Sequence, residues 1–331
     1  MTSSPKARRQ RIGWRPVLRI AGSLALLAGL AATIDLGETA RLLAGADPYA
    51  LAGLLLVAQL QVLLSAARWR LVAQRLRLPL GWAAACAEYY LCLLLNQLLP
   101  GGVSGDAIRA LRHARRLPAL PDGGGAGRAL RAVVLERFAG QVAFFAIAGL
   151  GLALWPMLMP GGYAPWTATM AAALGASILA VLAGFVLGSR IGPRRWRHGV
   201  AALVPEGRAA LLGAGAWRVQ LPLNLAVAAC LIAAFALAAD AVGPALPATA
   251  WITVVPLTLL ALVLPISVGG WGLRESAAAL LWPTVGLAPE AGVAAGLLYG
   301  LVMLLTGLPG LAAVLRRPRR APAPASPIGR A

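Results

Sequence analysis

The chain alternates long runs of hydrophobic residues with short polar segments, and this pattern extends from residue 17 to residue 315. A helix that crosses a membrane needs about 20 mostly apolar residues. We expect helices over nine runs: 17–34, 49–67, 82–99, 138–159, 166–188, 219–239, 249–268, 276–285 and 291–315. The run over 276–285 has only ten residues, so it is too short to span a membrane.

The composition agrees with this pattern. Hydrophobic residues make up 60% of the 331 positions and charged residues only 12%, whereas soluble domains are about 25% charged. Such a chain is excluded as an ordinary water-soluble enzyme, and also as a disordered chain, which would be poor in apolar residues. The runs are apolar on all sides rather than alternating, which excludes a β-barrel. The sequence therefore predicts an all-α polytopic integral membrane protein.

The chain is strongly basic, with 30 Lys and Arg against 11 Asp and Glu and a formal net charge of +19. All the cations except Arg41 and Arg274 fall in five segments between or beside the apolar runs, namely 6–19, 68–77, 109–137, 190–218 and 316–330. Cationic segments stay on the cytoplasmic side of a membrane, so orientation explains the charge and we expect no nucleic acid as partner. We expect a bacterial-type plasma membrane with both termini in the cytoplasm.

Because all five cationic segments should lie on the cytoplasmic side, the chain must cross the membrane an even number of times between any two of them. If 82–99 were a full span, the seven arginines over 109–137 would lie outside. We therefore predict a re-entrant hairpin over about 82–109 that enters from the cytoplasm, breaks and returns. Its break contains proline and glycine, which end helices, at Pro100, Gly101, Gly102 and Gly105.

The same argument predicts a second hairpin over about 249–285, which begins and ends on the outer side. Its break contains Pro265, Gly269, Gly270 and Gly272. The prediction is then about six full spans plus two re-entrant hairpins within a membrane domain over 17–315. A basic cytoplasmic tail over 1–16 precedes this domain, and a Pro- and Arg-rich cytoplasmic tail over 316–331 follows it. The alternative is eight or nine plain spans with exceptions to the charge rule.

The two breaks match each other in spacing. In both, a Leu-Pro pair is followed by a glycine five residues after the proline and by an arginine nine residues after it. The two arginines are Arg109 and Arg274, which are 165 positions apart, half the length of the chain. Broken segments at corresponding places in two halves are typical of transporter binding sites. With hairpins that enter from opposite sides, the match predicts an inverted repeat.

Charged residues beside these breaks are candidates for a binding site, because charges in a membrane are costly unless they are paired or functional. Helix N-termini favour anions, and a guanidinium can hold a phosphate by two hydrogen bonds. We expect the head group of an anionic lipid to be bound by Asn96, Asp106, Arg109, Arg274 and Glu275. The alternative is that Arg109 belongs to an interfacial cluster and that Arg274 and Glu275 form only a local ion pair.

Three further residues are expected as polar partners of this site: Glu88, Glu136 and Arg137. Glu88 shares a helix face with Cys92 and Asn96, because they are spaced four residues apart. Such a carboxylate could be neutral, salt-bridged or a proton carrier. The cysteines form no CxxC motif and no cluster with histidine, so we expect no metal site. No catalytic or cofactor-binding motif is found, so we expect neither enzymatic activity nor a cofactor.

The breaks resemble a known signature. The segment Asn96-Gln97-Leu98-Leu99-Pro100-Gly101-Gly102 with Gly105-Asp106 and Arg109, the pair Glu136-Arg137 and the segment 265–275 are similar to motifs of the lysylphosphatidylglycerol synthase transmembrane, flippase-like family. The resemblance covers roughly 17–315. It implies a membrane domain that moves lipids between leaflets. In some members this domain is fused to a soluble aminoacyl-transferase domain, which we do not find here, so aminoacylation is not expected.

Two functions remain open at this point. The first is a lipid translocator that moves an anionic phospholipid or an isoprenoid-type lipid through a groove between the two hairpins. The second is a non-transporting membrane subunit that docks a lipid-modifying or glycosyl-transferring enzyme through its basic loops. The expected partners are therefore membrane lipids and, in the second case, a lipid-synthesis enzyme.

Overall fold

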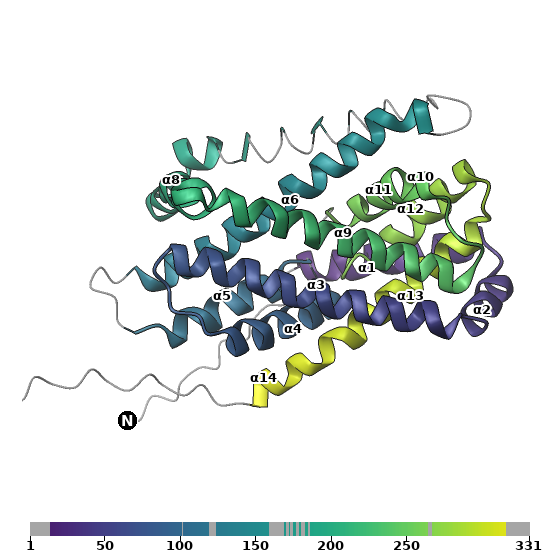
Figure 1. The fold of residues 1–331 in the computed structure, drawn as a ribbon, viewed down its shortest axis with the longest axis horizontal. Coiled ribbons are helices and arrows are strands. Elements are labelled where there is room, and N and C mark those ends of the chain that lie inside the picture. The colour runs from purple at the N-terminus through teal and green to yellow at the C-terminus, as the bar shows by residue number, and fades with distance from the viewer. Residues whose placement is uncertain are drawn as a thin grey trace, which may run out of the picture.

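The computed structural model describes residues 14–315 except 101, 119–123, 159–168, scattered positions over 170–185, and 264–266. This part of the chain is helical, with a single isolated β-bridge and no strand (Figure 1). The first half contains α1 (Trp14–Ala31), α2 (Leu36–Ala44), α3 (Pro48–Arg75), α4 (Trp82–Leu98), α5 (Ser104–Arg116) and α6 (Gly125–Leu158). The second half contains α8 (Arg194–Gly207), α9 (Trp217–Val242), α10 (Ala248–Ile252), α11 (Val254–Leu260), α12 (Leu273–Leu281), α13 (Pro289–Gly307) and α14 (Leu311–Leu315).

Among the described residues, four helices are long and apolar enough to cross a membrane: 48–75, 125–158, 217–242 and 289–314. A fifth span is obtained if 17–31 and 36–44, which meet at 97°, count as one broken span. The all-helical class is confirmed, whereas the predicted run over 166–188 falls largely outside the described residues. The acidic segment 35–47, between the first two predicted runs, contains α2, whose first turn is capped by the Asp35 carboxylate accepting from the Glu38 N–H at 3.0 Å.

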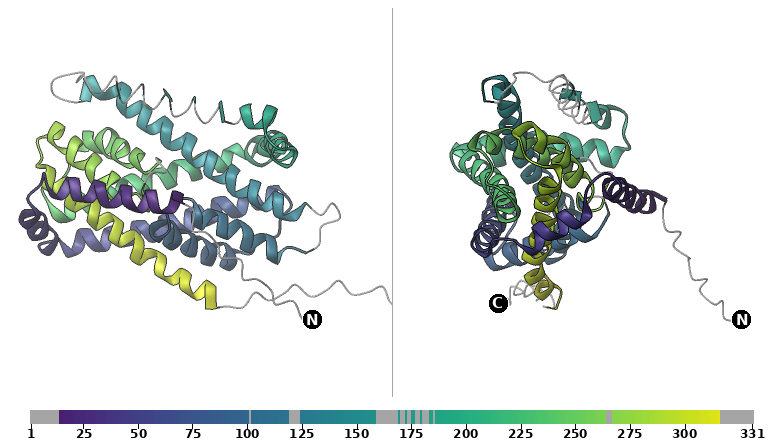
Figure 2. Two further views of the ribbon diagram at one scale, coloured as in Figure 1. Left: turned by 180° about the vertical axis from the view of Figure 1, so that it is seen from behind. Right: turned by 90° about the vertical axis from the view of Figure 1, so that its right-hand side faces the viewer.

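The ribbon views show the two ends of the bundle (Figures 1 and 2), and the elements found at these ends differ in the charged residues they carry. At one end, which we call the basic end, lie the C-termini of α3 and α5, the N-terminus of α6, and α8 and α14. Contacts join these parts: Arg75 donates to the Gly213 carbonyl at 3.2 Å, and Arg112 donates to the Ala313 carbonyl at 2.7 Å. At the opposite end, which we call the far end, the Asp47 N–H donates to the Ala241 carbonyl at 2.8 Å.

The hairpin of α4 and α5 begins and ends at the basic end, because α3 delivers the chain there and α6 leaves from there (Figure 1). The segment α10–α12 begins and ends at the far end, where α9 finishes and α13 starts. The two breaks meet inside the bundle, since Pro100 and Val268 form the isolated antiparallel bridge. The bundle therefore contains two broken helical segments that approach each other from opposite ends.

Two hydrophobic clusters hold this arrangement. One surrounds Trp69 and Val72 of α3 and includes residues of α4, α5 and α6. The other surrounds Phe235 of α9 and includes residues of α3, α11, α12 and α13. α3 belongs to both clusters and packs along α9. The polar site described next lies near the meeting point of the two breaks.

Candidate functional site

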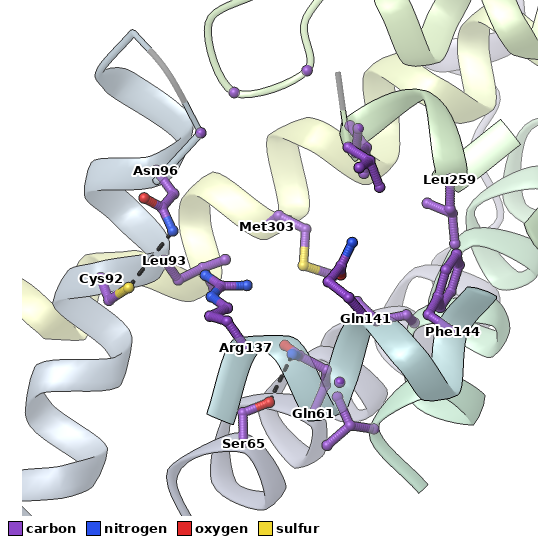
Figure 3. A pocket seen from close by; sticks show the side chains of 18 of the residues that line it. Gln61, Ser65, Cys92, Leu93, Asn96, Arg137, Gln141, Phe144, Leu259 and Met303 are labelled. Atoms are coloured by element: carbon purple, nitrogen blue, oxygen red, sulfur yellow. Dashed lines mark hydrogen bonds between the residues drawn. The ribbon is translucent and has the colours of Figure 1, made fainter. Parts of the chain in front are cut away.

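A cavity of about 440 Å³ opens where the two breaks meet, within the size range of small-molecule sites. Its wall includes Asn96, Gln97, Gly102 and Val103 from the first break and Ser267, Gly269, Gly270 and Arg274 from the second. α3, α6 and α9 supply further polar groups, namely Gln61, Ser65, Arg68, Arg137, Gln141 and Asn224. Apolar residues such as Phe144, Leu259 and Met303 line the rest (Figure 3). The cavity is thus amphipathic.

The bridge between the two breaks depends on a glycine. Gly269 has a φ of +57°, a conformation that side chains rarely adopt. A Cβ there would lie 2.6 Å from the Gln97 carbonyl oxygen and 2.9 Å from its Cα. The second break can therefore approach the C-terminal turn of α4 only because residue 269 has no side chain.

Beside the cavity, five charged side chains from three helices form one network, and all of them except Arg137 are buried. Glu136, which is fully buried, accepts from Arg68 Nε at 2.8 Å and from Arg109 Nη2 at 2.5 Å. The Tyr89 hydroxyl donates to the same carboxylate at 3.2 Å, and Arg68 also donates to the Asn224 amide oxygen at 2.9 Å. Glu136 thereby forms ion pairs with arginines of two different helices.

Asp106 is the second carboxylate of this network. Arg137 donates to its two oxygens at 2.9 and 2.7 Å, and Arg109 Nε donates to it at 3.0 Å. The Asn96 amide donates to Asp106 at 3.1 Å and accepts the Gly105 N–H at 2.8 Å. The network contains three arginines and two carboxylates, so it carries one net positive charge.

The arginines of this network differ in their access to the cavity. Arg109 is 1% exposed, and its guanidinium carbon lies 4.7 Å from the Trp69 ring centroid and 4.6 Å from that of Tyr89. Arg137 has a side chain that is 41% exposed and reaches from α6 toward α4 beside the cavity (Figure 3). Of the two, Arg137 therefore takes the place on the wall where the sequence predicted Arg109.

The second break presents its own arginine. Arg274 lines the cavity, and its guanidinium donates to Glu275 at 3.0 and 2.5 Å. Glu275 also accepts the Gly272 N–H at 2.7 Å, which anchors it to the first turn of α12. The Arg274 guanidinium lies 5.2 Å from the Trp271 ring centroid and 5.3 Å from that of Tyr299. Both matched arginines thus lie between a tryptophan and a tyrosine and beside a carboxylate.

Glu88 belongs to a different contact. Its carboxylate is 1% exposed and accepts from Arg112 at 2.8 Å and from Arg116 at 2.5 Å, toward the basic end. Together with the contacts of Cys92 and Asn96 to Asp106, this confirms that the three residues share the face of α4 that packs on α5. Glu88 is not on the cavity wall, so it joins the two arms of the hairpin.

The residues predicted for the breaks are placed as follows. Pro100 lies in the bridge, and Gly102, Gly269, Gly270 and Gly272 all have positive φ. Gly105 lies within the first turn of α5 instead of in the break, and a Cβ there would collide with the Cys92 carbonyl. Its small size serves close packing of α4 on α5. Gly101 and Pro265 lie outside the described residues.

Several wall residues escaped the sequence analysis. Arg68 was counted only as part of a basic segment, and Gln61, Ser65 and Asn224 were passed over. All except Arg68 are polar residues inside apolar runs, which is the signal that could have identified them. Ser267 is a further one, because its hydroxyl is buried on the wall and has no hydrogen-bond partner among the described residues. Within the same residues, no group of His, Cys, Asp and Glu could hold a metal ion.

The long apolar helices and the polar cavity between two broken segments define the class: an integral membrane protein of the polytopic helical type. The family model of the lysylphosphatidylglycerol synthase TM region matches residues 17–310, so the chain belongs to this family. This membership associates it with lipid metabolism. No curated protein matches the chain.

Proposed function

We propose that the protein moves an anionic phospholipid or isoprenoid-type lipid between the leaflets of the membrane, with the head group passing through the cavity. The observation that carries this proposal is the charge of the wall. Among the described residues, the charged residues of the wall are Arg68, Arg137 and Arg274. Their carboxylate partners do not line the cavity. An anionic head group suits such a surface, because guanidinium groups bind phosphate by paired hydrogen bonds.

The position of the cavity supports the same proposal. We take α4–α5 as a re-entrant hairpin from the cytoplasmic side and α10–α12 as one from the outer side, with six full spans around them. The cavity then lies at the depth where the two hairpins meet, where irregular backbone is tolerated if it is buried or lines a wet cavity. Apolar wall residues such as Leu259 and Phe144 suit the glycerol and upper acyl region of a lipid.

Reconstitution tests the proposal. Purified protein in phosphatidylcholine vesicles that contain a trace of acyl-labelled fluorescent phosphatidylglycerol should make the inner-leaflet label accessible to dithionite added outside. Arg137→Gln and Arg274→Gln should each slow this movement at least tenfold. Arg41→Gln is the matched control, because the Arg41 side chain is 76% exposed on α2 and far from the cavity.

The docking alternative predicts a different result. A subunit that only holds an enzyme would move no label between leaflets. Dithionite would then reach the same fraction of the label in vesicles with wild-type protein and with Arg137→Gln. The proposal is abandoned if wild-type protein, shown to be folded by size-exclusion chromatography, moves neither phosphatidylglycerol nor an isoprenoid phosphate. The absence of catalytic activity is part of the proposal, and the same preparation should leave the labelled lipids chemically intact.

A further inference from the structure

We propose that transport through the cavity is electrogenic: one lipid carrying a single net negative charge moves without a coupled proton, so the membrane potential drives it outward. This inference rests on the function proposed above and adds to it the charge of the substrate and the source of energy. Three observations carry it: the charge balance beside the cavity, the state of each carboxylate, and the charges of the wall.

The charge balance sets the charge of the substrate. Arg68, Arg109 and Arg137 face Glu136 and Asp106, which leaves one positive charge uncompensated. Arg274 and Glu275 compensate each other. A single negative charge from a ligand completes this balance. A zwitterionic head group would leave the positive charge in place.

The charge that a ligand can recruit is the one on Arg137. Its side chain is the most exposed of the three, at 41% against 5% for Arg68 and 1% for Arg109. If Arg137 turns from Asp106 to a phosphate, Asp106 keeps its hydrogen bonds from Arg109 and the Asn96 amide. The network can therefore release Arg137 to the ligand without leaving a carboxylate unpaired.

A proton carrier would need a carboxylate that is free to take up a proton. Glu136 is held by Arg68 and Arg109, and Asp106 by Arg109 and Arg137. Glu275 is held by Arg274 and the Gly272 N–H, and Glu88 by Arg112 and Arg116. Each of these four carboxylates therefore accepts at least two charge-assisted or capping hydrogen bonds, and none of them is without a partner.

The remaining titratable groups around the cavity are neutral near pH 7 by their ordinary chemistry. They are the phenols of Tyr89 and Tyr299 and the thiol of Cys92, all on the wall. His113 of α5 stacks edge-on against Trp69 and contacts the Pro79 carbonyl at 3.1 Å, away from the wall. Among the described residues, the cavity therefore offers charge for an anion but no exchangeable proton.

The direction follows from the sign of the charge. A cell interior is negative, so the potential favours the movement of an anion from the inner to the outer leaflet. For one full charge, 100 mV changes the equilibrium ratio between leaflets by roughly 50-fold. A zwitterionic lipid gains nothing from the same potential.

The experiment uses the proteoliposomes described above with a potassium gradient and valinomycin to set the potential. Dithionite measures the fraction of label in the outer leaflet. Because an electrogenic uniporter reaches the same equilibrium in either orientation, random insertion does not matter. With the interior negative, labelled phosphatidylglycerol should accumulate outside, and reversal of the potential should reverse the distribution. Labelled phosphatidylcholine is the matched control and should not respond.

A pH gradient imposed while valinomycin and equal potassium hold the potential at zero should leave the distribution of phosphatidylglycerol unchanged. Movement that ignores the potential, or that follows the pH gradient, overturns this inference while the proposed function stands. Protein that moves no lipid at any potential overturns the proposed function itself. Arg137→Gln should abolish the preference for phosphatidylglycerol over phosphatidylcholine, and an unchanged preference would overturn the assignment of the spare charge.

Discussion

Glu136 shows at the scale of one residue how this site is held. It is fully buried and links α6 to arginines of α3 and α5. Two cations that share one carboxylate in a buried place are stable only while the carboxylate remains ionised and present. The residue beside it along the chain, Arg137, has a different position, because its side chain is partly exposed and faces the cavity.

This difference predicts unequal effects on stability. Glu136→Gln should lower the free energy of unfolding by about 3–5 kcal/mol, because it leaves buried guanidinium groups without their counter-charge. Arg137→Gln should have a much smaller effect, since its side chain is partly exposed and Arg109 still faces Asp106. Thermal unfolding in detergent, followed by tryptophan fluorescence, measures both. Equal midpoints for the two variants would contradict the assignment of Glu136 as the centre of the network.

At the scale of elements, the two hairpins are built differently although their breaks match in spacing. α4 and α5 are joined by Glu88, Cys92 and Asn96, which contact α5 along its length. α12 is capped by Glu275 within its own first turn. The carboxylates that face Arg109 come partly from α6, whereas the one that faces Arg274 is its neighbour in the chain. The two breaks are therefore similar in the spacing of their residues but differ in the side-chain contacts that hold them.

The positions of the two breaks and of the long helices could be predicted from the sequence. Proline and glycine mark the breaks around residues 100 and 269, and hydrophobic length marks α3, α6, α9 and α13. The places of Arg109 and Arg137 could not be predicted. Both are arginines near the first break, and only packing decides that Trp69 and Tyr89 enclose one of them while the other faces the cavity. Contacts such as Arg68 with Asn224 join residues 156 positions apart, which no local pattern records.

The contact between the breaks can be tested by cross-linking. Residues paired in an antiparallel bridge have Cα atoms about 4.5–5.5 Å apart, within the range that a disulfide spans. Pro100→Cys with Val268→Cys, in a background where Cys86, Cys92 and Cys230 are alanine, should form a disulfide under mild oxidation. After cleavage at a protease site inserted between the two halves, the disulfide would keep the two fragments together as one band on a gel. Reduction would separate this band into two. Pro100→Cys with Leu280→Cys is the matched control, since Leu280 is 77% exposed beyond the break. Cross-linking in the control pair alone would contradict the meeting of the two breaks.

At the scale of the whole molecule, charge divides the bundle into two ends. The far end carries five acidic residues, namely Asp35, Glu38, Asp47, Asp240 and Glu290. Two contacts there join different segments: the Asp35 N–H lies 3.5 Å from a Glu290 oxygen, and the Leu246 N–H donates to the Asp240 carboxylate at 2.9 Å. The described arginines outside the site gather mainly at the basic end, as in Arg131 with Glu206 at 2.6 Å. This distribution matches the positive-inside rule with the basic end in the cytoplasm.

Labelling with an impermeant thiol reagent decides this orientation together with the first hairpin. In the same cysteine-free background, Arg115→Cys at the end of α5 and Arg208→Cys after α8 should be protected in intact cells and react only after permeabilisation. Ala44→Cys and Ala245→Cys, at the far end, should react in intact cells. All four positions are exposed in the structure, so a lack of labelling would not be due to burial within the protein.

If α4 were instead a full span, the side of the membrane would change between α3 and α5. With residues 166–188 as a full span, as predicted from the sequence, Arg115→Cys and Arg208→Cys would then both be labelled in intact cells and Ala245→Cys would be protected, and that pattern would replace the hairpin with a crossing.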